Sequence, residues 1–275
     1  MNKRILFVLI IATNVIHLFA QPATESGTIS IPKGYTKLVF HDEFNGNGLP
    51  DDSNWGYEEG YLRNSEKQYY ASKRLANSYQ KDGYLYLIAL NDSAEIAGKM
   101  HPITSASIHS KKTFNWKYGK VEVRTKLPMC LGTWPAIWMM PVKGVYGGWP
   151  KSGEIDIMEH VGYEPEKINY AIHTEAYNHM KKNGLGSNAF CPTCYTDFHV
   201  YGLEWHEDRV EWYLDGRKRF VINKPKNATW ESWPLDQPFY LILNLAFGGG
   251  WGGTKGIDMD GLPQEYVIDY VRIFQ

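Results

Sequence analysis

Three acidic residues lie close together in the segment 149–160. Glu154 and Asp156 are separated by one residue, and Glu159 follows three positions later. Isoleucine follows each of the first two acids, a pattern typical of a β-strand with one polar and one apolar face. In a regular strand Glu159 would point to the apolar face. We therefore expect a β-bulge at residues 157–158 that returns Glu159 to the polar face.

Three carboxyl groups on one face can carry out acid–base chemistry. Neighbouring negative charges raise the pKa of each acid, so at least one carboxyl group tends to keep its proton. A protonated acid beside an ionised one is the pair that glycoside hydrolysis requires. The alternative is a solvated strand whose acids have no special pairing.

Composition limits the classes of protein to consider. The chain has 275 residues and a formal net charge of -1, which gives no support for binding nucleic acid or an anionic membrane surface. Aromatic residues make up 15% of the chain, including ten tryptophans and nineteen tyrosines. This content is typical of a β-rich core and of a sugar-binding groove, and we expect both.

The N-terminus predicts export. Lys3 and Arg4 precede a short apolar run at 5–16, and Ala20 is a small residue at a cleavage point before Gln21. We expect a signal peptide at 1–20, a flexible lead-in at 21–34 and one domain at 35–275. The apolar run is too short to span a bilayer, and no other segment is a candidate for a membrane span.

The three cysteines leave several arrangements open. Cys191 and Cys194 form a Cys-x-x-Cys motif, and Cys130 is the third. A local disulfide would suit an exported protein, two unbonded thiols are the alternative, and a zinc site lacks a second Cys-x-x-Cys.

Short alternating segments and tight turns recur along the chain. Residues 118–127 alternate apolar and polar side chains, and Asp215-Gly216 predicts a two-residue hairpin turn. No long segment has helical periodicity. The pattern predicts an all-β fold, an antiparallel β-sandwich of the jelly-roll type.

The acidic segment also resembles a known family. Glu-Ile-Asp-Ile-Met-Glu at 154–159 is similar to the signature of family 16 glycoside hydrolases, in the bulged form found in laminarinases, agarases and carrageenases. The segments at 64–70, 132–141 and 244–251 resemble further parts of that family, and the resemblance runs from about residue 36 to residue 275. It implies a jelly roll with a concave substrate cleft.

The resemblance also implies roles for the acids. Glu154 would be the nucleophile and Glu159 the general acid/base of a retaining reaction. Asp156 would form a hydrogen bond to Glu154 and tune it. No cofactor would be required for catalysis.

Other positions are expected to bind substrate. Trp134 and Trp138 are four residues apart, so strand alternation puts both rings on one side, as a stacking platform or as core residues. His173 resembles a family histidine near the acid/base, although a single histidine can equally be structural. At Ser107 the family usually has arginine, so one substrate contact is in doubt. The expected substrate-binding residues are Asn64, Trp134, Trp138, Trp149, His173, Asn244 and Trp251.

A structural calcium ion is common in this family, away from the cleft. Glu43, the carbonyl group of Gly83 and Asp269 are the ligands expected by position. The alternative is that these are ordinary polar residues at strand ends.

The sequence thus predicts a secreted retaining endo-β-glucanase that hydrolyses β-1,3-glucan, mixed-linkage β-1,3/1,4-glucan or both. One alternative is an agarase-like galactan hydrolase of the same family. A second is a non-catalytic jelly roll that binds carbohydrate. We expect a bacterial monomer in the periplasm or outside the cell, with β-glucan as its partner.

Overall fold

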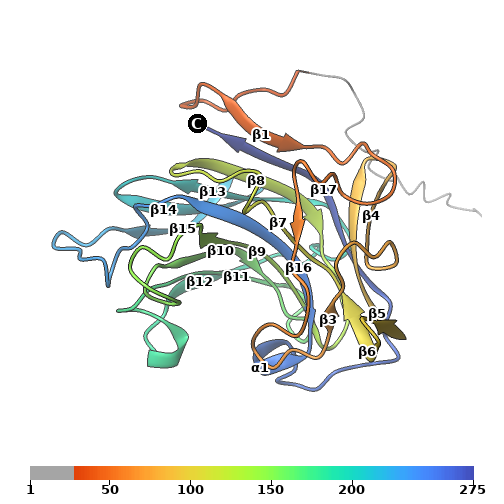
Figure 1. Ribbon diagram of the computed structural model, residues 1–275. Helices are drawn as coiled ribbons and strands as arrows, with labels where there is room; N and C mark the ends of the chain where they lie inside the picture. Colours follow the sequence, from red (N-terminus) through yellow and green to blue (C-terminus); the bar gives the residue numbers. More distant parts are fainter. Residues whose placement is uncertain (1–27) are drawn as a thin grey trace, which may run out of the picture.

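Two β-sheets packed face to face form the protein. The computed structural model describes residues 28–275, and Figure 1 shows the two sheets as layers, with β17, β8 and β13 in one and β16, β9, β10 and β11 in the other. The predicted signal peptide and the first part of the lead-in lie outside the described residues.

The larger sheet has ten strands in the order β15-β14-β13-β8-β17-β5-β6-β3, with β1 paired to β17 and β4 to β5. Their bounds are β1 Leu38–Asp42, β3 Tyr69–Tyr70, β4 Ser78–Lys81, β5 Tyr84–Ile96, β6 Lys99–Ser105, β8 Gly119–Lys126, β13 His199–Trp205, β14 Arg209–Leu214, β15 Arg217–Asn223 and β17 Gln264–Phe274.

The second sheet has seven strands in the order β12-β11-β10-β9-β16-β7-β2. Their bounds are β2 Gly56–Tyr57, β7 Ser107–His109, β9 Thr133–Pro141, β10 Glu154–Glu159, β11 Lys167–His173, β12 Leu185–Phe190 and β16 Phe239–Phe247.

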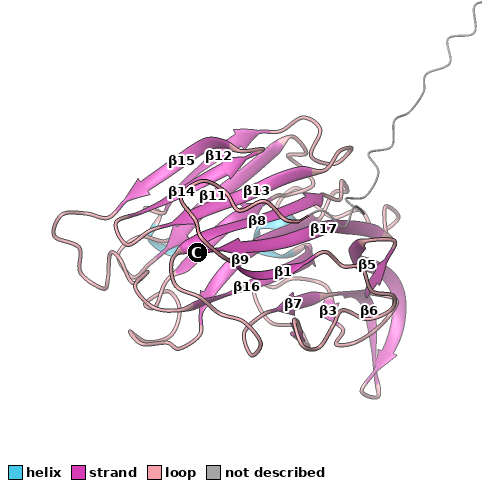
Figure 2. Cartoon of the chain, turned by 90° about the horizontal axis from the view of Figure 1, so that it is seen from above, coloured by secondary structure: helices cyan, strands magenta, loops and turns pink. Residues whose placement is uncertain are grey.

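The predicted all-β sandwich is confirmed. Every strand pair is antiparallel except β3 with β6, which is parallel. Figure 2 shows how little of the chain is helical. Helical structure in the described part is limited to the one-turn helix α1 at Gly249–Gly252 and a 3-10 turn at His179–Lys181. The hairpin predicted at Asp215-Gly216 joins β14 to β15.

The acidic segment forms β10, which lies between β9 and β11 near the middle of its sheet. The register on both sides shifts after Asp156, so the predicted bulge is confirmed. Ile155, Ile157 and Met158 are fully buried between the sheets. The extra residue therefore places its side chain in the core.

The opposing sheet supports the bulge directly. The indole N–H of Trp212, on β14, donates a hydrogen bond to the Asp156 carbonyl oxygen at 2.8 Å. Trp212 is itself fully buried. An unpaired buried carbonyl group would cost free energy, so this bond stabilises the irregular backbone where the register changes.

The predictions about membrane spans and about the cysteines can be compared with the structure. Within residues 28–275, no helix has the length and apolar character needed to cross a membrane. Cys130, Cys191 and Cys194 are buried, unbonded thiols in the structure. The Cys194 thiol donates a hydrogen bond to the Pro165 carbonyl group at 3.1 Å. This bond holds its side chain near the start of β11.

Candidate active site

The three acids share the face of the seven-stranded sheet that points away from the other sheet, called here the site face. In the ladder with β11, Glu154 lies opposite His173, Asp156 opposite Ala171 and Glu159 opposite Asn169. Residues opposite one another in a ladder point to the same side. The bulge therefore brings the third carboxyl group to the face of the first two.

His173 lies beside two of the acids. Its Nε2 is 3.3 Å from Asp156 Oδ2 and 3.8 Å from Glu154 Oε1. The side chains of Glu154 and Asp156 are 15% and 3% exposed, so this contact forms in a largely water-free place. From the resemblance we expected this histidine near Glu159. In the structure it lies next to Glu154 and Asp156 instead.

Glu159 has an aromatic partner instead. The Trp134 indole N–H donates to Glu159 Oε1 at 3.0 Å. The Trp134 ring meets the Trp251 ring edge to face, with centroids 5.4 Å apart. Of the predicted tryptophans, Trp134 therefore contacts and orients Glu159, and Trp251 packs against Trp134.

Burial raises the pKa of all three acids, and the charges of neighbouring acids raise the pKa of Glu154 and Glu159 further. Burial is the largest cause, and it raises the pKa of Glu154 to about 8 and that of Asp156 to about 7. The pKa of Glu159 is raised well above its usual range, by burial and then by the charges of Asp156 and Glu154. The Trp134 hydrogen bond acts in the opposite direction and does not reverse this shift.

These shifts divide the protons among the acids. The pKa of Glu159 lies well above its usual range, so this carboxyl group keeps its proton, which suits a general acid. Glu154 and Asp156 lie next to each other with pKa values of about 8 and about 7, so around neutral pH they hold about one proton between them, mainly on Glu154. Glu154 must pass this proton on to become the ionised group that a nucleophile requires.

Two aromatic groups rise beside the acids from neighbouring loops. Trp149 is 38% exposed, and its ring lies 6.1 Å from the His173 ring. His179, from the 3-10 turn, lies 5.3 Å from Trp149 and 5.1 Å from His173. Sequence reasoning predicted Trp149 and His173 but missed His179, which the loop after β11 brings to them.

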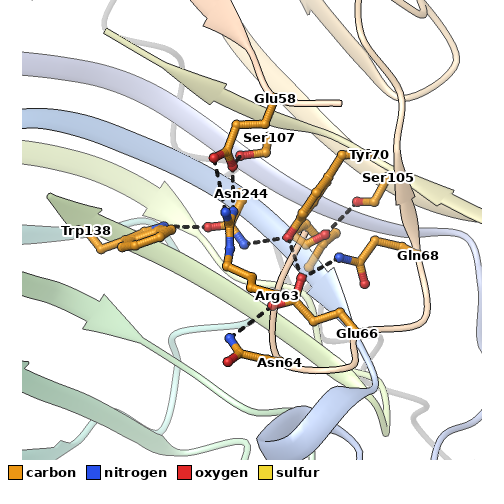
Figure 3. A network of polar contacts seen from close by, with 11 residues as sticks. Glu58, Arg63, Asn64, Glu66, Gln68, Tyr70, Ser105, Ser107, Trp138 and Asn244 are labelled. Atoms are coloured by element: carbon orange, nitrogen blue, oxygen red, sulfur yellow. Dashed lines mark hydrogen bonds and ion pairs between the residues drawn. The ribbon is translucent and has the colours of Figure 1, made fainter. Parts of the chain in front are cut away.

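The remaining predicted residues lie on the other side of the acids, in the polar network of Figure 3. Trp138 lies opposite Asp156 in the ladder and donates its indole N–H to Asn244 at 2.7 Å. Asn244 in turn donates to the Tyr70 hydroxyl group at 2.9 Å. Asn244 is only 4% exposed, so its amide orients Trp138 and Tyr70 more than it offers groups to a substrate. Asn64 is exposed and donates to Glu66 at 3.2 Å.

The same network contains an ion pair that sequence reasoning missed. Arg63 donates to both carboxylate oxygens of Glu58, at 3.0 and 2.5 Å, and Ser107 donates to one of them at 2.6 Å. Burial acts to raise the pKa of Glu58, but Arg63 outweighs it and the pKa is lowered. Arg63 directly precedes the segment 64–70 that resembles the family. This position is a signal that could have identified it.

The expected calcium ligands do not form a ready site. Glu43 is held by Arg272 through two hydrogen bonds, at 2.9 and 2.7 Å, and Asp269 is paired with Arg124. The carboxylates that were to bind the ion are each neutralised by a guanidinium group. This donor set does not fit a calcium ion as it stands, and the ion stays a prediction from the resemblance alone.

The raised pKa of Glu159 has a consequence for stability. The folded state keeps a proton that the unfolded chain releases above about pH 4.5, so the free energy of unfolding falls as the pH rises toward the raised pKa. Glu159→Gln removes this loss and keeps an oxygen for Trp134. At about pH 8 we expect the variant to be more stable by ~1 kcal/mol or more, a rise in Tm of at least ~2 °C.

Thermal unfolding followed by circular dichroism measures this difference, which should vanish near pH 4. The exposed Glu265→Gln is the matched control and should leave Tm unchanged at both pH values. A Glu159→Gln variant no more stable than the parent at pH 8 would show that burial does not strain this carboxyl group.

Asp156→Asn should move the pH profile of activity. The charge of Asp156 raises the pKa of both Glu154 and Glu159, so its removal lowers both values. The acidic limb, where Glu154 ionises, and the basic limb, where Glu159 loses its proton, should both shift to lower pH. Measurement of kcat/KM across pH tests this, and a profile with unmoved limbs would contradict the electrostatic coupling.

Comparison with known proteins agrees with this geometry. The family model "Glycosyl hydrolases family 16" matches residues 65–272. A β-glucanase of Rhodothermus marinus is 41% identical over 87% of this chain and 85% of its own length. The crystal structure of SCLam, a non-specific endo-β-1,3(4)-glucanase co-crystallised with 1,3-β-D-cellotriosyl-glucose, has a TM-score of 0.84 at 40% identity, covering 90% of this chain and 96% of the other.

A keratan-sulfate endo-1,4-β-galactosidase of Sphingobacterium multivorum is also similar, at 35% identity over 87% of this chain and 55% of its own length. Relatives of this chain thus include enzymes named for glucan and for galactan. The matched region contains every acid of the site. The chain belongs to family 16 of the glycoside hydrolases.

Proposed function

We propose that this protein is a retaining endo-β-glucanase that hydrolyses β-1,3-glucan and, as a second activity, mixed-linkage β-1,3/1,4-glucan. The observation that carries the proposal is the trio of buried acids, in which the pKa of Glu159 lies well above its usual range while those of Glu154 and Asp156 are about 8 and about 7. Retaining hydrolysis needs a division between a protonated acid and an ionised nucleophile.

In the first step Glu154 attacks the anomeric carbon of the sugar. Glu159 donates its proton to the glycosidic oxygen as that bond breaks, and a covalent glycosyl-enzyme ester forms on Glu154. Before the attack, the proton that Glu154 and Asp156 share passes to Asp156, which then donates a hydrogen bond to the ionised Glu154 and holds its carboxylate in place. His173, 3.3 Å from Asp156, fixes the side chain of that neighbour.

In the second step Glu159, now ionised, takes a proton from a water molecule. The resulting hydroxide attacks the anomeric carbon and releases Glu154, so the configuration of the sugar is retained after two inversions. Trp134 stabilises the ionised form of Glu159 through its hydrogen bond at 3.0 Å. The bond therefore supports the step in which Glu159 acts as a base.

Glucan is favoured over the alternatives by the names of the first relatives and by local charge. Arg63 is the cation of the network beside the acids, and Glu58 already neutralises it. A sulfated galactan would need unpaired cations to bind its sulfate groups. A neutral glucan needs groups that bind hydroxyls and aromatic faces on which its sugars stack. An agarase-like activity is the second candidate, because a galactosidase is among the relatives.

A binding module without turnover is the remaining alternative. It would have no use for three carboxyl groups whose ionisation is opposed by burial. The export, the monomeric state and the location in the periplasm or outside the cell are proposed with the enzyme. The predicted signal peptide and the polymeric substrate support them.

The activity test uses laminarin, lichenan and agarose with a reducing-sugar assay. We expect turnover of laminarin first, lichenan second and none of agarose. Glu154→Gln and Glu159→Gln should each lower kcat by about 100-fold or more, because a nucleophile or a proton donor is removed. The exposed Glu265→Gln should retain parental kcat.

Each variant should keep the circular dichroism spectrum of the parent. Near-normal turnover by either glutamine variant would exclude the assigned role of that acid. Turnover of agarose in place of laminarin would favour the galactan alternative, and turnover of none of the three would favour a binding module.

A further inference from the structure

Arg63 lies against a tryptophan beside the active acids. It comes from the loop between β2 and β3, yet its guanidinium group lies 4.8 Å from the ring centroid of Trp138 on β9. Trp138 is opposite Asp156 in the ladder of β9 with β10. The loop thus brings a cation to β9, on the opposite side of β10 from His173. Figure 3 shows Arg63 in the network that also contains Trp138.

Hydrogen bonds hold the Arg63–Glu58 pair in place. Glu58 accepts two hydrogen bonds from Arg63, and Ser107, fully buried on β7, donates a third bond to the same carboxylate. Bidentate pairing of this kind fixes the plane of a guanidinium group as well as its position. Ser107 occupies the position where the family usually has an arginine.

The groups beneath Arg63 are already satisfied by one another. Trp138 donates to Asn244, Asn244 donates to Tyr70, and Tyr70 donates to Glu66. Tyr70 and Asn244 are 0% and 4% exposed, so they offer little to an incoming molecule. The outward-facing donors of this network must come from its rim.

Arg63 supplies such donors. A guanidinium group has five N–H bonds, and the bonds to Glu58 use two of them. The side chain is 22% exposed, so it is partly open to solvent at the edge of the network. Arg63 also covers part of the Trp138 ring, which limits that ring as a free stacking surface and puts charged donors in front of it.

We propose that Arg63 is a substrate-binding residue that donates hydrogen bonds to hydroxyl groups of a sugar unit on the β9 side of the acids, with Glu58 and Ser107 as positioning residues. The proposal rests on the glucanase function proposed above and deepens it. The loop arginine supplies the guanidinium group that β7 lacks at Ser107. The pair of Arg63 and Glu58 has no net charge, which suits an uncharged ligand.

The test measures binding without turnover. In a Glu154→Gln background, isothermal titration with β-1,3-gluco-oligosaccharides gives the Kd. Arg63→Met keeps an apolar stem over Trp138 and removes the donors, and we expect Kd to rise about tenfold or more. Arg63→Lys keeps the charge but not the fork, and its Kd should lie between those of the parent and Arg63→Met.

Arg74→Met is the matched control. Arg74 is also partly buried and paired with an acid, Asp92, at 2.7 Å, with side-chain exposures of 31% and 25%. Its loss should leave Kd unchanged within about twofold. Ser107→Ala removes one of the two hydrogen bonds to Glu58 Oε2 and leaves the one from Arg63. It should weaken binding by less than Arg63→Met does, which identifies Ser107 as a positioning residue.

An Arg63→Met variant with parental Kd and an intact circular dichroism spectrum would overturn the proposal. So would equal weakening by Arg63→Met and Arg74→Met, because that result assigns Arg63 a general structural role. Failure of the proposed glucanase function is distinguishable, since the protein with Glu154 intact would then release no reducing sugar from laminarin.

Discussion

The structure depends on how β10 accommodates a third carboxyl group. Glu154, Asp156 and Glu159 repel one another in a place where water is scarce, and a regular strand would keep Glu159 away from the other two. The bulge brings it back at the cost of an irregular backbone. Trp212 stabilises that irregularity from the opposing sheet through the Asp156 carbonyl group. The core of the sandwich and the chemistry of its open face are therefore linked at one residue.

The neighbouring strands divide the work around this cluster. On one side, β11 contributes His173 beside Glu154 and Asp156, and on the other, β9 contributes Trp134 to Glu159 and Trp138 to the polar network. Glu154 and Asp156 thus share His173 as a partner, whereas Glu159 has Trp134. Because the partners differ, the three carboxyl groups differ in how readily they ionise, and their roles in a two-step reaction follow from that difference.

Local pattern predicted much of the fold and part of the site. Alternation placed the strands, and the spacing of Glu154 and Glu159 predicted the bulge. Alternation also put Trp134 and Trp138 on one face. The sequence could not predict what Asn244 does, because its burial depends on Tyr70 arriving from a distant segment. Glu58 and Ser107 meet across a separation of 49 residues, and no local pattern predicts such a contact.

Carbohydrate chemistry offers the most direct test of the central claim, that the bulge makes Glu154 and Glu159 a nucleophile and acid/base pair. Proton NMR of a laminarin oligosaccharide during the first minutes of hydrolysis identifies the anomer that forms before mutarotation. A retaining pair predicts the β-anomer first. If the α-anomer appears first, water attacks the sugar directly, and the assignment of Glu154 as a covalent nucleophile is wrong.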